Sequence, residues 1–301
     1  MSQHLRILES SIIVLSRNLR HKKKEKNIMA VSSEKKSIVN QNGLKVCFES
    51  KGHVYKVFDK EQQLKYKPIS VTTLIHKYQK PFDLEGMSML CAKKEGVTQQ
   101  EIKDRWAKIN KTACKHGTRM HSVAERIFNG DFVDDSTFTP EQQVVFKQIE
   151  SVVKKMKERP YDYESEKIIF DPVINVAGTV DLIGRHKESG DYLLIDWKTN
   201  KRIRMDNEWG DTFLSPIDTL PDCEFNLYGL QLAMYEHILK EGGFVEPDAK
   251  FRKFICHFHA ETGCKFHEIG DKFNPFKDMI LADWKKRQDA LKAMNVDIPN
   301  F

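Results

Sequence analysis

The stretch Leu193-Leu-Ile-Asp-Trp-Lys-Thr199 begins with three apolar residues and ends in an acid, a tryptophan and a lysine. The apolar run predicts a buried strand, and side chains two apart on a strand point to the same face. Asp196 and Lys198 would therefore share one side. Asp181 lies upstream on another apolar stretch, and the turn residues Glu188-Ser-Gly-Asp191 predict a hairpin that brings it to the same place.

Two carboxylates at one point bind hard divalent cations through oxygen, and a neighbouring lysine can stabilise charge on a reacting group. An Asp-x-Lys pair alone is more often a structural ion pair at a strand edge. Further polar residues favour a reactive site here. His121 and Glu125 are four residues apart, so a helix would place them on one face, and an imidazole among carboxylates suits Mn²⁺. Glu166, preferred to Glu164, would add a carboxylate.

Two other groups of residues are candidates for contacts with nucleic acid. Tyr228, Gln231 and Tyr235 share one face of a predicted helix, where an amide can bind a phosphate and a ring can stack on a base. A half-buried helix face is the alternative. Basic residues near the candidate site would bind backbone phosphates, with solvated loops as the alternative; they are Lys115, Arg119, Lys201, Arg202 and Arg204.

Composition limits the remaining possibilities. The chain has 301 residues, enough for one large or two small domains, and 40% hydrophobic residues support a sizeable core. Its net charge is +6, but residues 1–30 carry seven Lys and Arg against two Glu, which leaves +1 for the rest. Any phosphate-binding surface must therefore be local. No apolar run of about 18 residues is present, so no membrane span is expected.

The six cysteines form no Cys-x-x-Cys pair, and no secretory signal precedes them, which indicates reduced thiols in an intracellular protein. Cys256, His257, His259, Cys264 and His267 suggest a zinc site. Strand alternation would send Cys256 and His257 to opposite faces, so tetrahedral zinc is not predicted. A phosphate-binding Gly-x-x-x-x-Gly-Lys-Ser/Thr loop is missing, so no nucleotide cofactor is expected.

Residues 1–40 are expected to lie outside the fold, as a disordered or targeting extension. Leu5, Leu8, Ile12, Leu15 and Leu19 recur at helical spacing among Arg and Ser, which is typical of a mitochondrial transit peptide. The alternative is an upstream extension of a chain that starts at Met29. Without targeting, the location would be the cytoplasm or nucleus, including that of a host cell for a viral protein.

The fold is predicted to start near Gly43, with a hairpin over 46–58. Ser70 begins a helix that Pro81 ends. Thr98 and Glu101 form a capping box for a helix that Gly117-Thr118 interrupts, and a second helix then carries His121. Further segments follow the helical pattern: 140–156 and 274–294, capped at Thr139 and Asn274, and a helix that carries Gln231 and Tyr235 after the loop 206–222. Strands are predicted over 167–170, 174–183, 192–197 and 251–259.

Four motifs, in this order, resemble the RecB-type branch of the PD-(D/E)XK nuclease superfamily. They are Gly117-Thr-Arg-Met-His121, Gly178-Thr-Val-Asp181, Ile195-Asp-Trp-Lys-Thr199 and Gln231-Leu-Ala-Met-Tyr235, within residues 43–290. The resemblance is strongest to the mitochondrial genome maintenance exonucleases and to stand-alone viral and phage relatives. It implies an α/β, restriction-endonuclease-like fold, with a central mixed sheet flanked by helices.

The resemblance also implies roles for the motif residues. His121, Asp181, Asp196 and the main-chain carbonyl of Trp197 would surround Mg²⁺ or Mn²⁺, Lys198 would be catalytic, and Gln231 and Tyr235 would complete the site. Val180 departs from the pattern, which has proline before the first acid. Only Cys256 and Cys264 follow Gln231, so the iron–sulfur cluster of some relatives is not expected.

The sequence therefore predicts a single nuclease domain over 43–301, with a helical wall or arch over 70–130, a catalytic sheet over 160–260 and a final helix over 274–294. We expect a metal-dependent DNA nuclease without a membrane association. An exonuclease acting on single-stranded ends or flaps, in replication, repair or recombination, is favoured. A structure-specific DNA or RNA endonuclease and a catalytically idle nucleic-acid-binding module are the alternatives.

Overall fold

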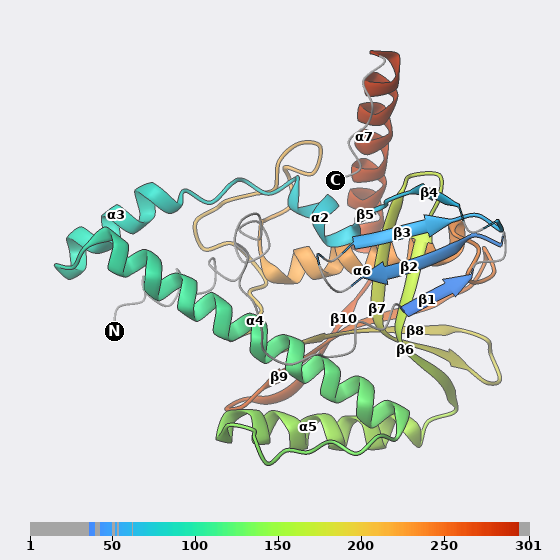
Figure 1. Cartoon of the computed structure of the whole chain (residues 1–301), viewed down its shortest axis with the longest axis horizontal. Helices are drawn as coiled ribbons and strands as arrows, with labels where there is room; N and C mark the ends of the chain where they lie inside the picture. The colour runs from blue at the N-terminus through green and yellow to red at the C-terminus, as the bar shows by residue number, and fades with distance from the viewer. Residues whose placement is uncertain (1–35, 40–42, 50–51, 53, 62, 295–301) are drawn as a thin grey trace.

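A six-stranded mixed sheet lies at the centre of the computed structural model, which describes residues 36–39, 43–49, 52, 54–61 and 63–294 (Figure 1). Helices cover both faces of this sheet, which confirms the predicted α/β class with a central mixed sheet flanked by helices. A second sheet of four antiparallel strands lies beside it; its strands are β1 (Lys36–Val39), β2 (Lys45–Glu49), β3 (Val54–Phe58) and β4 (Leu64–Tyr66).

The central sheet has the strand order β10-β9-β8-β7-β5, with β6 also paired to β7. Pairing is antiparallel for β6–β7, β7–β8 and β9–β10 and parallel for β8–β9 and β5–β7. Helix α6 (Glu224–Glu241) is the crossover that a parallel β8–β9 pair requires. The strands are β5 (Ile69–Ser70), β6 (Tyr161–Asp171), β7 (Val176–His186), β8 (Tyr192–Lys198), β9 (Phe251–His259) and β10 (Gly263–Ile269).

Strand alternation divides the core between the two faces of the sheet. Ile195 and Trp197 of β8 pack with α4 (Gln99–Asn129) and α5 (Pro140–Lys157). Leu194, which directly precedes Ile195, packs on the other face with α2 (Val71–His76), α6 and α7 (Asn274–Ala293). The functional end of β8 is therefore enclosed by helices on two sides. Within the described residues, no helix is long and apolar enough to cross a bilayer.

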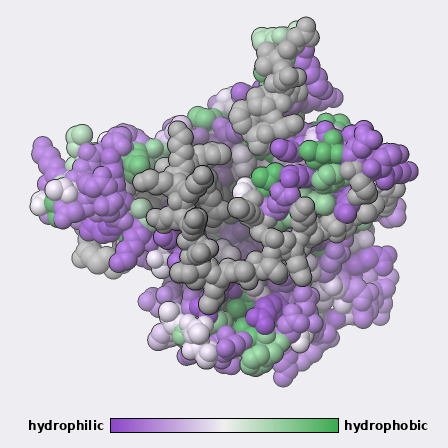
Figure 2. All heavy atoms as spheres, viewed as in Figure 1, coloured by the Kyte–Doolittle hydropathy of each residue, from purple (hydrophilic) through white to green (hydrophobic). Residues whose placement is uncertain are grey.

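Helix α3 (Leu84–Glu95) and the first half of α4 form a hairpin that extends away from the sheet (Figure 1). Its own small core holds Ala92, Ile102 and Trp106. The space-filling view shows this projecting part, at the left, as largely hydrophilic (Figure 2). The hairpin occupies the segment for which the sequence predicted a wall or arch.

Contacts join both ends of this hairpin to the loop that follows β8. At one end, Lys80 Nζ lies 3.0 Å from Asp211 Oδ1, and the Leu214 amide donates to the Tyr78 carbonyl at 2.6 Å. At the other end, a Cβ on Gly117 of α4 would meet Thr199 Oγ1 at 3.6 Å. The hairpin and the loop therefore enclose a ring of chain, one end of which lies beside the end of β8.

Helix α4 corrects the predicted break at Gly117-Thr118. The helix runs unbroken from the Thr98–Glu101 capping box to a left-handed C-cap at Gly130. A Cβ at Gly117 would make only an ordinary contact with Thr199, so the helix passes the end of β8 without needing glycine at this position. Glycine lowers helix propensity by only about 1 kcal/mol, which the packed flanking turns outweigh.

The ends of several other elements differ from their predictions. Strand β1 precedes the predicted start of the fold near Gly43 and pairs with β2 at the edge of the second sheet. Helix α2 ends at His76, well before Pro81. Phe273, not Asn274, precedes α7, and Met294 is 71% exposed rather than inward because α7 extends past the core. Strand β10 was not predicted. The predicted targeting helix lies outside the described residues.

Alanine at the two glycines near the site should have opposite effects. Gly117→Ala should raise the free energy of unfolding by about 0.5–1 kcal/mol, because the Cβ meets only an ordinary contact and helix propensity improves. Gly178→Ala should lower it by about 1–3 kcal/mol, because its Cβ would lie 2.5 Å from the buried Tyr235 ring. Urea denaturation of both variants gives the comparison. A destabilised Gly117→Ala protein would contradict the unbroken helix.

Candidate active site

The site lies where strands β7 and β8 separate. Their ladder runs from Arg185–Tyr192 to Leu182–Ile195 and stops before Asp181 and Asp196. Beyond that point the Trp197 amide donates its hydrogen bond to Asp181 Oδ2, at 2.8 Å, instead of to a backbone carbonyl of β7. The divergence opens a space in the sheet that side chains from both helical layers can reach.

Helix α6 holds the groups on one side of this space. Gln231 Nε2 donates to Asp196 Oδ1 at 2.9 Å and to the Tyr235 hydroxyl at 3.0 Å. Lys198 Nζ lies 2.5 Å from Asp196 Oδ2 and 4.4 Å from the centre of the Tyr228 ring. Asp196 is only 2% exposed, so these contacts fix a buried carboxylate and orient the lysine beside it.

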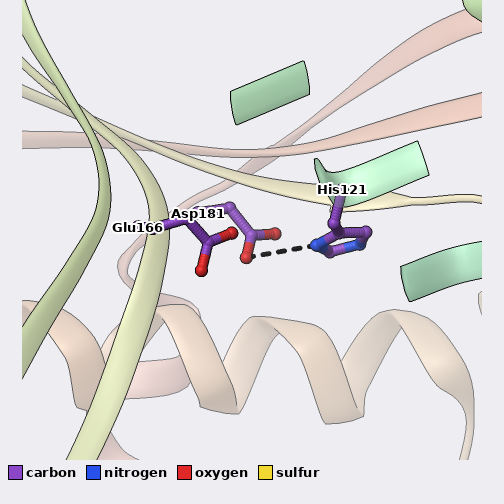
Figure 3. Close-up of side chains that lie close together, drawn as sticks. All are labelled: His121, Glu166 and Asp181. Atoms are coloured by element: carbon purple, nitrogen blue, oxygen red, sulfur yellow. Dashed lines mark ion pairs between the residues drawn. The ribbon is translucent and has the colours of Figure 1, made fainter. Parts of the chain in front are cut away.

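Helix α4 and strand β6 supply the groups on the other side. His121, Glu166 and Asp181 turn their side chains toward one another (Figure 3), and one ligand atom from each lies within 4.8 Å of the others. His121 Nδ1 is 3.4 Å from Asp181 Oδ1. Glu125, one turn further along α4, is half-buried and lies outside this group of three.

An unusual backbone conformation brings Glu166 into the group. Its neighbours Ser165 and Lys167 pair with Leu182 and Val180, so Glu166 is opposite Asp181. Its φ is 52°, in the left-handed region that side chains other than glycine rarely adopt. Such strain typically costs about 1–3 kcal/mol and concentrates at functional sites. Glu164, the alternative carboxylate, instead contacts Lys167 at the surface.

The two aspartates have opposite electrostatic environments. Burial raises the pKa of Asp196 above its usual value, although the adjacent Lys198 opposes this effect. Burial also acts to raise the pKa of Asp181, but the charges of His121 and Lys198 outweigh it, so that pKa is lowered. Burial acts to lower the pKa of His121, yet the Asp181 carboxylate outweighs it and the pKa is raised. The site therefore concentrates negative charge that a cation would stabilise.

These residues fit a divalent cation. Asp196 Oδ2 is buried and, apart from its ion pair with Lys198, accepts no well-aligned hydrogen bond from the described residues. One imidazole and two or three carboxylates form a donor set suited to Mg²⁺ or Mn²⁺. His121, Glu166 and Asp181 would hold the ion on the α4 side, and Asp196 lies on the adjacent strand β8.

Two residues outside the predicted set support the site. Gly178 makes room for Tyr235, and His257 Nε2 bonds the Asn200 carbonyl at 2.6 Å, just beyond Lys198. His257 pairs in register with Lys198 across the parallel β8–β9 ladder, a contact that spacing in the sequence does not reveal. Cys256 packs in the core on the opposite face from His257, as strand alternation predicts.

The predicted phosphate contacts are distributed unevenly. Lys201 is exposed, and Arg202 lies 3.8 Å from Glu208. Arg204 is a correction: its guanidinium makes two 2.7 Å hydrogen bonds to Glu224, and both side chains are nearly buried. Arg204 therefore anchors the loop to the start of α6 rather than facing a phosphate.

Arg119 also makes contacts away from the carboxylates. Its guanidinium stacks 4.3 Å above the Phe138 ring and bonds Thr137, both in the segment between α4 and α5. Lys115 is exposed one turn earlier on the same helix. These two residues therefore belong to a different side of α4 from His121.

Comparison with known proteins identifies a family for this chain. The sequence model of the PD-(D/E)XK nuclease superfamily matches residues 98–295, which include every residue of the site described above. A solved structure from Eubacterium rectale, described as a candidate exonuclease, is similar at 12% identity and a TM-score of 0.37, over 60% of this chain and 69% of that one. No curated protein matches the chain.

Metal affinity should depend on the group of three. Glu166→Gln and Asp181→Asn should each weaken Mn²⁺ binding at least about tenfold, because each removes a charged ligand. Glu164→Gln is the matched control, since it neutralises a carboxylate two residues away that faces solvent. Calorimetric titration without nucleic acid measures this directly. Equal losses in Glu164→Gln and Glu166→Gln would contradict the assignment.

We predict that Arg204 stabilises the fold through its ion pair with Glu224 and does not bind nucleic acid. Arg204→Ala leaves Glu224 buried without its partner, which should cost about 3–5 kcal/mol of unfolding free energy. Arg202→Ala removes the same charge from a half-exposed position, so its cost should stay below about 1 kcal/mol. Chemical denaturation separates the two. A stable Arg204→Ala protein with weakened nucleic-acid binding would instead make Arg204 a phosphate contact.

Proposed function

The chain belongs to the PD-(D/E)XK nuclease superfamily, and from this premise we propose that it is a metal-dependent DNA exonuclease that acts on single-stranded ends. The observation that carries this proposal is the arrangement at the strand divergence. Three candidate metal ligands converge there within 4.8 Å, and a lysine is held against the second aspartate. A half-buried group of charged side chains beside the buried Asp196 is costly unless it is used, which favours an enzyme over a binding module.

In this proposal His121, Glu166, Asp181 and Asp196 would hold Mg²⁺ or Mn²⁺, with the Trp197 carbonyl beside them. A bound divalent cation would supply an activated water and neutralise charge that grows on the scissile phosphate. The Asp181 carboxylate also has a structural role. Because it also accepts the Trp197 amide, it fixes the position of β8 relative to β7.

Lys198 is the residue proposed to act on the reacting phosphate. Its ammonium is held between Asp196 and the Tyr228 ring, so it points into the site with little freedom. From there it can orient the attacking water or stabilise the extra negative charge of the transition state. Gln231 and Tyr235 position Asp196 through a buried hydrogen-bonded chain rather than by contact with the substrate.

The closed ring of chain supports a preference for free ends. Residues 78–117 and the loop 199–214 are joined by the Lys80–Asp211 ion pair and the Leu214–Tyr78 backbone hydrogen bond, and Gly117 lies near Thr199 at the other end. A strand that reaches the site through such a ring must present an end, and a duplex is wider than a single strand. Membership of the RecB-type branch and a role in DNA replication, repair or recombination form part of the same proposal.

The decisive comparison uses a linear single-stranded DNA and a closed single-stranded circle of the same sequence, each incubated with Mg²⁺ or Mn²⁺. The wild type should degrade the linear strand alone, and Lys198→Ala should lower this rate at least about a hundredfold while retaining DNA binding. Lys285→Ala, at an exposed position of α7, is the control variant with the same loss of charge and should keep the wild-type rate. Equal cleavage of the circle would establish an endonuclease. Full activity of Lys198→Ala would refute the site.

A further inference from the structure

Helix α4 carries a second functional face, turned away from His121. Lys111, Lys115, Arg119 and Arg126 recur at steps of four, four and seven residues, which places them on one stripe of the helix. This basic stripe is centred about 120° around α4 from His121 and extends about 22 Å along it. The stripe is thus distinct from the site but built on the same helix.

The basic stripe forms one wall of a preformed groove. The groove has a volume of about 910 Å³, in the range of ligand-binding clefts. Its opposite wall is the segment between α4 and α5, whose Val133 and Phe138 provide an apolar floor with Ala107 and Val123 of the helix. Arg126 donates to the Phe132 carbonyl and Arg119 to Thr137, so both arginines fasten the two walls together.

The charge of the groove is strongly unbalanced. Among the lining residues there are four cations and one acid, Asp134. Asp134 Oδ1 already accepts the Ser136 amide at 2.9 Å, so it is engaged in the local turn. Lys111 and Lys115 are exposed and, within the described residues, form no hydrogen bond or ion pair. Two exposed ammonium groups and a mainly apolar floor therefore line the same groove, a combination that can bind phosphates together with the apolar faces of bases.

We propose that this groove binds the uncut part of the single strand whose end occupies the active site. The inference rests on the proposed function and adds a separate binding surface to it. An acidic peptide would also match the charge, but the apolar floor and the shared helix favour a strand that continues from the site. A duplex would present only its phosphates to this floor. The groove would hold the strand between successive cuts, so its contribution should depend on strand length.

The test compares linear oligo(dT) of 30 and of 6 nucleotides. Lys111→Ala/Lys115→Ala should lower the ratio of kcat/KM for the long strand over the short one about tenfold. Binding of the 30-mer is measured with Lys198→Ala protein, with and without the Lys111→Ala/Lys115→Ala substitutions. The slope of log affinity against log salt concentration should be smaller by about 1.4 with them, since each single-strand phosphate contact contributes about 0.7. Lys285→Ala/Lys286→Ala removes two exposed charges from α7 and is the matched control.

The outcomes separate this inference from the function on which it rests. Wild-type protein that cuts neither strand would contradict the proposed function. The salt dependence of oligo(dT) binding by the Lys198→Ala proteins would then test strand binding in the groove by itself. If the Lys111→Ala/Lys115→Ala protein has the same kcat/KM ratio and the same salt slope as the α7 control, the groove does not bind the strand. Unchanged oligo(dT) binding with lost binding of a poly-glutamate peptide would also overturn it, in favour of a docking site for an acidic protein segment.

Discussion

The hydrogen bond from the Trp197 amide to the Asp181 carboxylate is the interaction on which the site depends. A strand that leaves its neighbour exposes amides that must find another partner, because an unpaired buried amide is costly. Here a side chain of β7 provides that partner. The strands can therefore diverge without losing the position of β8, and the space between them becomes available for charged groups. The Asp181 carboxylate therefore both holds β8 in position and belongs to the candidate metal ligands.

The surrounding contacts all restrain the elements that enter this space. Gln231 and Tyr235 fix Asp196 from α6, and Gly178 permits their approach. His257 holds the first turn of the loop beyond Lys198, and further along Arg204 ties the same loop to Glu224. Such buried polar pairs contribute little net stability, but each removes a degree of freedom from the site. Preorganisation of this kind is what electrostatic catalysis requires.

Local signals in the sequence predicted much of this structure. Apolar stretches predicted strands β7, β8 and β9, and the caps at Thr98 and Thr139 predicted the starts of α4 and α5. The pairing of Asp196 with Lys198 followed from the period of two. Prediction failed where a distant contact decides the outcome. Gly117 favours a helix break in the sequence, because the tertiary packing of the turns on either side, which keeps α4 continuous, does not show in the local pattern. Arg204 was assigned to phosphate because Glu224 is far along the chain.

Roles could be predicted only as far as residue types allow. The carboxylates, lysine and glutamine suggested metal-dependent hydrolysis, and the superfamily match agrees with a nuclease. Neither spacing nor composition could show that Glu166 turns into the site through a left-handed φ, or that the two faces of α4 differ. Both properties depend on how β6 and the segment before α5 pack against the helix. They were available only once the three-dimensional arrangement was known.

The most direct test of this account is the anomalous scattering of Mn²⁺ in crystals of the protein. The account predicts a peak where β7 and β8 diverge, with His121, Glu166 and Asp181 among the ligands and their oxygen and nitrogen atoms about 2.0–2.3 Å from the ion. The peak should vanish in Asp181→Asn crystals. A fully occupied peak elsewhere, with none between these residues, would contradict the central claim that the strand divergence is the metal site.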